Sequence, residues 1–490
     1  MKRSFLFVAI LLASMISAFA ENVSVQTAQT AAQSFLNAKM GNTQQISLVE
    51  FVERADFHNL YVFGNERCFV IIAGDDAVHP VLGYSTENGF CEETMPDEVR
   101  SWLQTYDSEI AFIKNNRLEA LPEAREGWGN LLSGKELEPK SRSFVKPLIH
   151  TWWNQKAPFN NLCPADEAGP GGHAVAGCGA IAMAQIMNYW EHPVRGVGSH
   201  SYSHSVYGEQ YVNFAATTYD WDNIKGTYST GYTDEEALAV ATLVYHCGVS
   251  VDMEYGPNSS NVRRPILDDA MRDYFDYSPN TEYVFKSQYT DNQWIVMLKS
   301  DLDDLQPVLY RAASNNQGAN AHLFICDGYD ENNYFHFNWG HGGNYDGYYT
   351  ISGLHEGSTN YTYGNAAMFG CKPNTPPINP PTNISASVAG RTVTVSWNSV
   401  SNASYYKLYR DDLLFPIAER FHPFQILASQ LDQISHSFPT SFTLSTTYPA
   451  PSRFPMILFA SSMSVVFTMS NICRFLIGYS IFLTFTSTVI

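Results

Sequence analysis

A cysteine flanked by glycines, Cys178, is the residue of this chain best placed to act as a nucleophile. It lies in the segment GCGAIAMAQIMNYW, residues 177–190, and directly precedes a strong helical pattern. At a helix N-terminus, the helix dipole and the unpaired backbone N–H groups lower the pKa of a thiol and favour the reactive thiolate. The same N–H groups can bind an oxyanion that develops during acyl transfer. The sequence therefore predicts a nucleophilic Cys178, provided that a base lies near it.

The best candidate for this base is His322, one of 14 histidines in the chain. His322 opens an apolar strand pattern that ends in the turn Asp327-Gly328, and the next strand pattern carries Asn338 and Trp339. A hairpin of these strands can place the Asn338 amide oxygen beside the imidazole, where it fixes the ring tautomer, while Trp339 shields the pair from water. Cys, His and Asn follow in the order of papain-like peptidases, in which His lies roughly 130 to 150 residues after Cys.

An oxyanion donor can come from Gln155, which precedes the cysteine in the segment Trp153-Asn154-Gln155. Its side-chain amide could complete an oxyanion hole together with the Cys178 N–H. Taken singly, these residues allow plainer interpretations. A histidine in a strand is more commonly a satisfied core residue, and Gln155 could equally be a surface amide.

Taken together, the motifs resemble the streptopain family of secreted bacterial cysteine peptidases over most of residues 21–373. The resemblance implies an α+β fold, with a papain-like, two-part catalytic domain preceded by an α+β inhibitory pro-domain that is removed on activation. It also implies broad endopeptidase activity, with a preference for an apolar side chain at the second residue before the cleaved bond. The motifs that carry the resemblance are residues 69–76, 80–85, 153–155, 158–160, 177–187, 248–257, 322–328 and 338–340.

The resemblance gives each site residue an expected role. Cys178 corresponds to the nucleophile, His322 to the general base and acid, and Gln155 to the oxyanion donor. Asn338 and Trp339 correspond to the pair that supports the histidine. The residues expected to line the substrate cleft are Trp339, Ala321, Ser259 and Ser260.

The chain departs from the family pattern at two places. His341 stands where the family usually has a second tryptophan, and Asn320-Ala321 replaces the usual Gly-Gly before the histidine. The first change alters the aromatic wall of the site, and the second could narrow the cleft. Neither change removes the cysteine or the histidine of the predicted dyad.

Composition and patterning divide the chain into five segments. Residues 1–20 combine a basic start, an apolar stretch and a small-residue ending, as in a secretory signal peptide. Residues 21–142 form the expected pro-domain, which ends in a charged, Pro-containing linker suited to proteolytic removal. Residues 143–373 form the expected peptidase domain. Residues 374–412 combine a Pro-rich linker with strand patterns that resemble the first half of a fibronectin type III module, a β-sandwich.

The last segment, residues 413–490, differs abruptly in composition from the rest and contains no lysine. One hypothesis is a non-native, out-of-frame C-terminus. The other is a membrane anchor, because the segment from Met456 to Cys473 carries no formal charge. The serine, threonine and asparagine residues within that segment argue against the anchor.

The net charge of −19 disfavours nucleic acid and anionic membranes as partners. The 8 cysteines show neither metal-ligand spacing nor the pattern of a disulfide framework. We therefore expect no metal and no organic cofactor. The expected partners are protein and peptide substrates and the chain's own pro-domain, and the expected location is secreted or on the cell surface.

Two other functions remain open at this point. A Cys-His site can also serve an acyltransferase or an amidase. The fibronectin-like segment and His341 are compatible with a catalytically silent adhesin. A pro-domain favours the peptidase, because it suggests a hydrolytic activity that must be held latent.

Overall fold

The structure is a computed structural model that describes residues 22–374, apart from 42–44, 50–56, 92–94, 263–265, 313–320, 356–357 and 359–363, together with strands after residue 384. The predicted signal peptide, residues 1–20, lies outside the described residues. So does most of the segment 413–490. In the part of the chain that the structure describes, no helix is long and apolar enough to cross a membrane.

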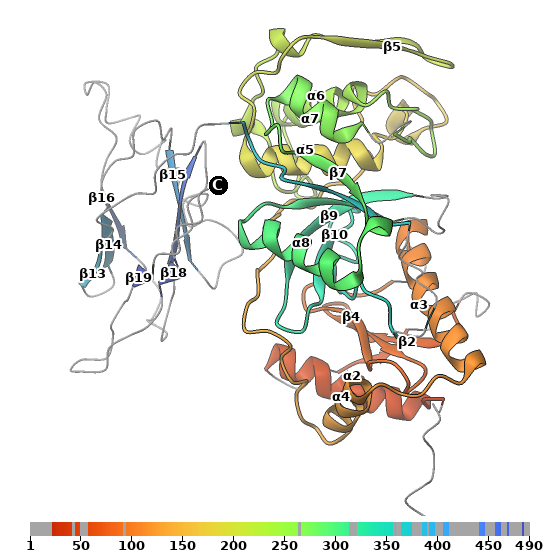
Figure 1. Ribbon diagram of the computed structural model, residues 1–490. Coiled ribbons are helices and arrows are strands. Elements are labelled where there is room, and N and C mark those ends of the chain that lie inside the picture. The colour runs from red at the N-terminus through yellow and green to blue at the C-terminus, as the bar shows by residue number, and fades with distance from the viewer. Residues whose placement is uncertain are drawn as a thin grey trace, which may run out of the picture.

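The N-terminal unit combines three helices with a small antiparallel sheet, which agrees with the α+β unit expected here (Figure 1). Its first helix is capped by the Ser24 side chain, which accepts a hydrogen bond from the Thr27 N–H. Its third strand is buried at every position. The elements are α2 Val25–Met40, β1 Ser47–Leu48, β2 Leu60–Gly64, β3 Phe69–Ala73, β4 Val81–Ser85, α3 Asp97–Asn116 and α4 Pro122–Leu132.

The central region has two parts, a helical part and a sheet part. The helical part buries the small and apolar residues of its first helix, which begins at Cys178. Its main elements are α5 Cys178–Trp190, the hairpin β5 His200–His204 and β6 Gly208–Val212, α6 Asp234–Ser250 and α7 Leu267–Phe275. The sheet part contains β7 Glu282–Phe285, α8 Asp291–Asp303, β8 Val308–Ala312, β9 His322–Tyr329, β10 Phe335–Asn338, β11 Gly347–Tyr349 and β12 Ala366–Phe369.

One sheet of ten strands joins the N-terminal unit to the central region, in the order β1-β2-β3-β4-β11-β10-β9-β8-β12-β7. The joint is the antiparallel pair of β4 and β11, in which Tyr84 lies opposite Tyr348 and Gly83 opposite Tyr349. A Cβ atom at Gly83 would stand 2.9 Å from the Tyr348 carbonyl oxygen, so this close approach requires glycine. The N-terminal unit is therefore bound to the central region by strand addition as well as by side chains.

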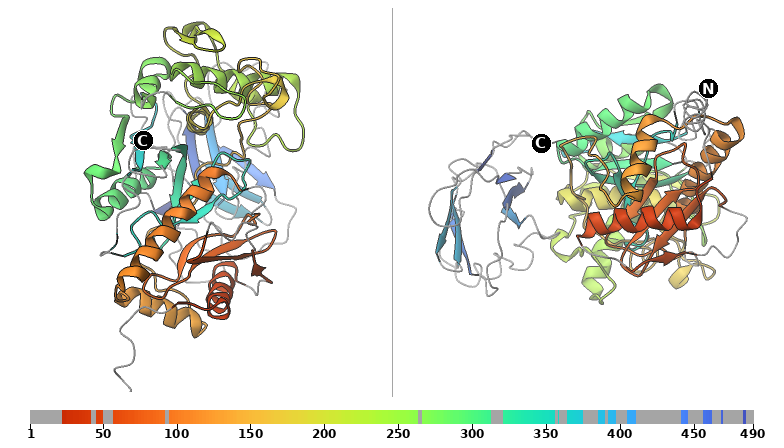
Figure 2. Two further views of the ribbon diagram at one scale, coloured as in Figure 1. Left: turned by 90° about the vertical axis from the view of Figure 1, so that its right-hand side faces the viewer. Right: turned by 90° about the horizontal axis from the view of Figure 1, so that it is seen from below.

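One face of α3 also lies against the central region (Figure 2). Glu98, Trp102, Tyr106 and Glu109 recur at the spacing that brings side chains to one side of a helix. Trp102 packs edge-on against the Phe337 ring, with centroids 5.2 Å apart. The Tyr106 hydroxyl donates to the Thr350 carbonyl over 2.7 Å. This stripe of α3 packs against the sheet that contains β9, and His322 is the first residue of that strand.

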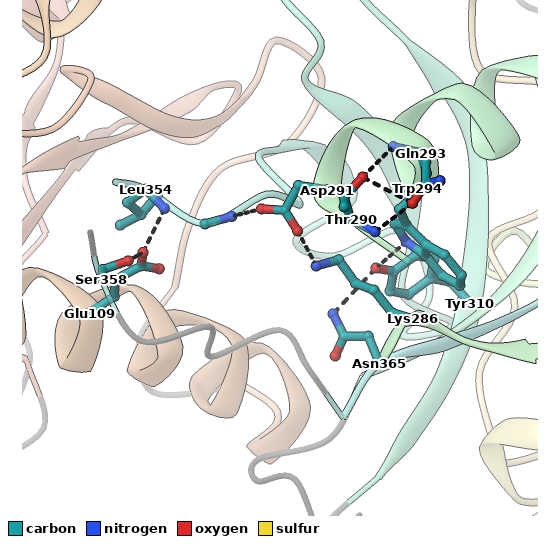
Figure 3. A network of polar contacts seen from close by, with 11 residues as sticks. Glu109, Lys286, Thr290, Asp291, Gln293, Trp294, Tyr310, Leu354, Ser358 and Asn365 are labelled. Carbon is teal, nitrogen blue, oxygen red and sulfur yellow. Dashed lines mark hydrogen bonds and ion pairs between the residues drawn. The ribbon is translucent and has the colours of Figure 1, made fainter. Parts of the chain in front are cut away.

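Figure 3 shows the polar end of this contact. The Glu109 carboxylate accepts hydrogen bonds from the Leu354 N–H, at 2.7 Å, and from the Ser358 hydroxyl. From the other side, Asp291 accepts from the Gly353 N–H at 2.7 Å and pairs with the buried Lys286. The loop after β11 is thus held between a carboxylate of the N-terminal unit and one of the central region.

Beyond residue 384 the described elements are strands. The two strand patterns that were predicted between residues 393 and 409 are confirmed as strands, and β14 pairs with both β13 and β16, while β15 pairs with β17. Two of these partners belong to the segment 413–490. The strands are β13 Ser385–Ala389, β14 Thr392–Ser396, β15 Tyr405–Arg410, β16 Ser441–Ser445, β17 Met456–Ser461, β18 Thr468–Met469 and β19 Leu483–Thr484.

Candidate active site

Cys178 occupies the first position of α5, as the sequence predicts. The preceding Gly177 has φ +91°, and a Cβ atom there would stand 2.8 Å from the Met253 side chain. Only glycine combines this backbone conformation with so little space. Cys178 itself is half-buried and is one of the free cysteines. The turn that begins α5 therefore holds the thiol at the surface of a tightly packed helix.

The thiol is not activated in this structure. Burial and, to a smaller extent, the charge of Glu98 raise the pKa of Cys178 to about 11, against the opposing effect of the backbone N–H groups of Leu323, Gly179 and Cys178 itself. The expectation of a thiolate at the helix N-terminus is thus not met while α3 is in place. The start of β9 lies close to this turn, since a Cβ atom at Gly179 would stand 3.0 Å from the side chain of Leu323, one residue after His322.

His322 is the first residue of β9 and is only 3% exposed. Its Nε2 lies 3.1 Å from the Trp339 carbonyl oxygen, and its Nδ1 lies 3.2 Å from Oε1 of Glu98. Among the described contacts, no hydrogen bond joins His322 to Cys178. The N-terminal unit therefore holds the histidine in a pair with Glu98.

Burial lowers the pKa of His322 to about 4, although the charge of Glu98 acts in the opposite direction. Burial would by itself raise the pKa of Glu98, but His322 and His341 lower it to about 2. At neutral pH the site thus contains a carboxylate, a neutral His322 and a thiol. This state cannot begin an attack through a thiolate and an imidazolium.

Asn338 does not touch His322 in this structure, contrary to the sequence-based expectation. Its side-chain nitrogen donates to the Thr151 carbonyl at 2.8 Å, and its side-chain oxygen accepts from the Gly340 N–H at 3.1 Å. The register explains the difference, because a bulge between His336 and Phe337 sets Asn338 opposite Ile325. The Trp339 carbonyl contacts the imidazole instead.

Trp339 lies beside the histidine but is fully buried. Its ring is stacked near His322, with centroids 6.4 Å apart, and Trp102 of α3 covers it edge-on at 6.1 Å. The predicted shielding of the histidine by an aromatic ring therefore agrees with the geometry. A substrate could reach this ring only after α3 has moved.

Gln155 lies next to the turn that carries the cysteine, because its carbonyl accepts from the Ala176 N–H at 3.1 Å. Its side chain is half-buried, and among the described residues its amide group makes no hydrogen bond. The arrangement leaves this amide available to bind a substrate oxygen.

The other residues predicted to line the substrate cleft, Ser259, Ser260 and Ala321, differ in how free their side chains are to contact a substrate. The Ser260 hydroxyl donates to the Val175 carbonyl at 2.7 Å and accepts from the Gly256 N–H, so it fastens two loops and is not free to bind a substrate. Ser259 is exposed beside it, and Ala321 is half-buried just before β9. Asn320 lies outside the described residues.

Two residues at the centre of the site were missed or undervalued by sequence reasoning. The sequence motifs do not single out Glu98, and they mark His341 only as a departure from a family pattern. His341 stacks on His322 with ring centroids 5.5 Å apart, and its Nε2 lies 3.4 Å from Oε2 of Glu98. Only the docking of α3 brings the three residues together.

Comparisons with known proteins agree with this geometry. The family model described as "Peptidase C10 family" matches residues 153–349, and the family model described as "Spi protease inhibitor" matches residues 20–110. The chain is 30% identical to the thiol protease/hemagglutinin PrtT of Porphyromonas gingivalis over 297 residues, which are 60% of this chain but only 34% of that relative.

Streptopain of Streptococcus pyogenes is 30% identical over 338 residues, which cover 64% of this chain and 81% of streptopain. Among solved structures, a fragment of Prevotella intermedia prointerpain A is 32% identical with a TM-score of 0.56, and the match covers 68% of this chain and all of that fragment. An inhibitory N-terminal unit that shares a sheet with a Cys-His domain accounts for both family matches. The chain belongs to the Peptidase C10 family, and it is a cysteine peptidase made as a zymogen.

Proposed function

We propose that Cys178 is the nucleophile and His322 the general base and acid of a secreted cysteine endopeptidase. The observation that carries the proposal is the packing of β9 against α5: a Cβ atom at Gly179 would stand 3.0 Å from the Leu323 side chain, so the start of β9 lies beside the N-terminus of α5. Rotation of the His322 side chain would then bring the imidazole toward the thiol. Family membership supports the same assignment.

Activation requires that Glu98 leaves the site. The carboxylate raises the pKa of the Cys178 thiol and occupies Nδ1 of His322. When the pro-domain departs, both effects end and water reaches the thiol, so the pKa of Cys178 falls toward the range in which a thiolate forms. The helix dipole of α5 then acts without an opposing charge.

In the proposed reaction, the Cys178 thiolate attacks a peptide carbonyl carbon and forms a tetrahedral intermediate. The Cys178 N–H and the Gln155 side-chain amide donate to the oxyanion. The His322 imidazolium gives its proton to the departing amine, which leaves a thioester. The imidazole then removes a proton from water, and the resulting attack releases the acyl group and restores the thiol.

Asn338 and Trp339 have supporting roles in this proposal. After activation, Asn338 would orient the His322 ring, and Trp339 would keep bulk water away and line the cleft. Ala321 and Ser259 would form further parts of the cleft wall. Ser260 would act indirectly, because its hydroxyl holds the loops next to Gly177.

We propose domain limits that follow these roles: a signal peptide at 1–20, the pro-domain at 21–142 and the peptidase domain at 143–373. Residues 374–412 would form a linker and half of a fibronectin-like module, a proposal supported by the pairing of β13 with β14. Residues 413–490 would be a tail of unusual composition. An acyltransferase would use the same dyad, but an inhibitory pro-domain favours peptide hydrolysis.

The function is tested by incubating the purified wild-type precursor in mild reductant and following its mass and casein hydrolysis together. The linker is accessible to cleavage, since Lys140 and Arg142 are exposed and Phe144 is 58% exposed. We expect the precursor to shorten to a form that begins between Lys140 and Lys146 and to gain activity at the same time. A precursor that is processed yet transfers acyl groups only to added amines would contradict an endopeptidase.

The pH dependence of pro-domain docking provides a further test. Burial raises the pKa of Glu109 to about 7, and the charge of Asp291 adds to the shift. Docking favours the protonated form of Glu109. The stabilisation of the docked state by this group is therefore fully present below about pH 4.5 and is lost as the pH rises through about 7. We expect docking to be weaker at pH 8 than at pH 5, by roughly tenfold or more.

The measurement is the rate of limited trypsin cleavage of a Cys178→Ala precursor at the 135–144 linker and within α3, corrected for the pH profile of trypsin with casein. Glu109→Gln keeps the size of the side chain and removes its titration, so its docking should change much less between pH 5 and pH 8. Equal pH dependence in the two proteins would refute the role of Glu109.

A further inference from the structure

We infer that Glu98, His322 and His341 form a binding site for a divalent transition-metal ion of the zinc type, which exists only while the pro-domain is docked. Among the described residues, this is the one group of three His, Cys, Asp or Glu side chains whose ligand atoms converge, all within 4.8 Å of one another. Glu98 comes from the pro-domain, and both histidines come from the peptidase domain. The inference rests on the proposed zymogen but adds a ligand to it.

The ligand atoms, which lie within 4.8 Å of one another, are close to the spacing that a tetrahedral ion requires. Nδ1 of His322 lies 3.2 Å from one oxygen of Glu98, and Nε2 of His341 lies 3.4 Å from the other. Zinc with ligands at about 2.0 to 2.1 Å requires neighbouring ligand atoms about 3.3 Å apart. Two imidazoles and one carboxylate, with a fourth position open to water, form a common zinc ligand set. Small movements of the side chains would complete the geometry.

The hydrogen bond on the far side of His322 supports the same ion. A carbonyl oxygen only accepts, so the 3.1 Å contact between Nε2 and the Trp339 carbonyl assigns the ring proton to Nε2. The lone pair of Nδ1 then points at the Glu98 carboxylate. A metal-binding histidine typically has this arrangement, with its second nitrogen donating to a carbonyl. Without an ion, this contact needs a second ring proton, on Nδ1, which converts His322 to an imidazolium, and a metal ion would take the place of that proton.

His341, the third ligand, also has a ring nitrogen that faces the Glu98 carboxylate. Nε2 of His341 is buried and makes no hydrogen bond in the described part of the chain. Its nearest polar partner is the Glu98 carboxylate at 3.4 Å. The rings of His341 and His322 are nearly parallel, at 13°, so both can direct a nitrogen toward Glu98. A cation between the three side chains would satisfy all of them together.

The consequence is a metal-dependent latency. An ion that binds the docked state and not the separated state stabilises docking by mass action. At a free zinc concentration of 100 times the dissociation constant, the undocked population falls about 100-fold. Precursor in zinc-rich surroundings would stay latent, and loss of zinc would favour maturation.

The test is zinc binding by the full-length precursor that carries Cys178→Ala. This substitution prevents processing and removes the catalytic thiol as an alternative zinc ligand. We expect calorimetry to show one zinc ion per chain, and cobalt to give the absorption bands of a tetrahedral site. In the same background, Glu98→Gln and His341→Phe should each weaken binding by about tenfold or more, since even the loss of a partner outside the first ligand sphere costs 10- to 100-fold.

His200→Gln provides a matched control. His200 pairs with Asp252 at 2.7 Å, so it tests whether any histidine beside a carboxylate binds zinc, and its substitution should leave the affinity unchanged. Thermal unfolding without zinc identifies a variant that fails to fold. If His341→Phe fails to fold, the test rests on the zinc affinity of Glu98→Gln, which keeps the shape of the side chain.

Absence of zinc binding by the Cys178→Ala precursor, or equal binding after Glu98→Gln and His341→Phe, would overturn the site. Because binding is measured in a catalytically inactive protein, either outcome leaves the proposed peptidase untouched. Failure of casein hydrolysis by the wild type would in turn leave the metal site standing.

Discussion

Replacing Cys178 by alanine should lower casein hydrolysis by on the order of 10⁴-fold or more and should stop self-processing of the precursor. Without the sulfur no thioester can form, and only binding and oxyanion stabilisation remain to accelerate attack by water. The helix and its packing should be preserved, because alanine fits the first turn of α5 and the neighbouring helix positions are already small and buried. The measurement is the initial rate of casein hydrolysis together with the mass of the chain over time.

Cys91→Ser is the matched control for this substitution. Cys91 is also a free cysteine but is exposed and belongs to the pro-domain, so its loss should leave both processing and hydrolysis near the wild-type level. His322→Ala should resemble Cys178→Ala, since neither member of the dyad works alone. A Cys178→Ala protein that digests casein at the wild-type rate would refute the assigned nucleophile.

Removing the Trp102 side chain should release the latent state. Trp102 is almost fully buried, and its ring lies 5.2 Å from Phe337 and 6.1 Å from Trp339. Truncation of a buried tryptophan typically costs about 3 to 5 kcal/mol of stability. The share of this free energy that comes from contacts between Trp102 and the peptidase domain is lost from docking. We expect Trp102→Ala to mature about 10²-fold faster than the wild type in reductant.

Gln104→Ala serves as the comparison, because Gln104 belongs to the same helix but is exposed and lies outside the stripe that contains Glu98 and Trp102. Its maturation rate should stay near that of the wild type. Trp102→Phe, which keeps a ring in the contact, should give an intermediate rate. Maturation of Trp102→Ala at the wild-type rate would show that this side chain does not hold the pro-domain in place.

Together, these experiments separate chemistry from latency. Cys178 and His322 should control hydrolysis, whereas Trp102, Glu109 and Glu98 should control when hydrolysis begins. Glu98 connects the two, because it contacts the histidine directly and its charge raises the pKa of the thiol.

The sequence predicts the dyad because each residue carries a local signal. A glycine before Cys178 and a helical pattern after it define a helix start, and an apolar run that begins with His322 and ends in Asp-Gly defines a strand. Both elements are present in the structure at the predicted residues.

Asn338 shows where local patterns stop being sufficient. Alternation along two strands suggests a hairpin that sets its amide beside His322, but one bulge after His336 shifts the pairing. A shift of one residue changes the face on which a side chain lies. The cost of such a bulge depends on its neighbours in the folded sheet, so the strand sequence by itself does not reveal it.

By itself, the sequence determined which residues can act as nucleophile and base, and that an α+β unit precedes them. Those properties depend on neighbours along the chain. The tertiary structure alone decided that β4 pairs with β11, that Trp102 covers Trp339, and that Glu98 meets both His322 and His341. These contacts join segments far apart in sequence, and they form because burial of a shared core favours one docking of the two units over all others. Latency is therefore a property of that docking, while the capacity for catalysis is already present in the short motifs.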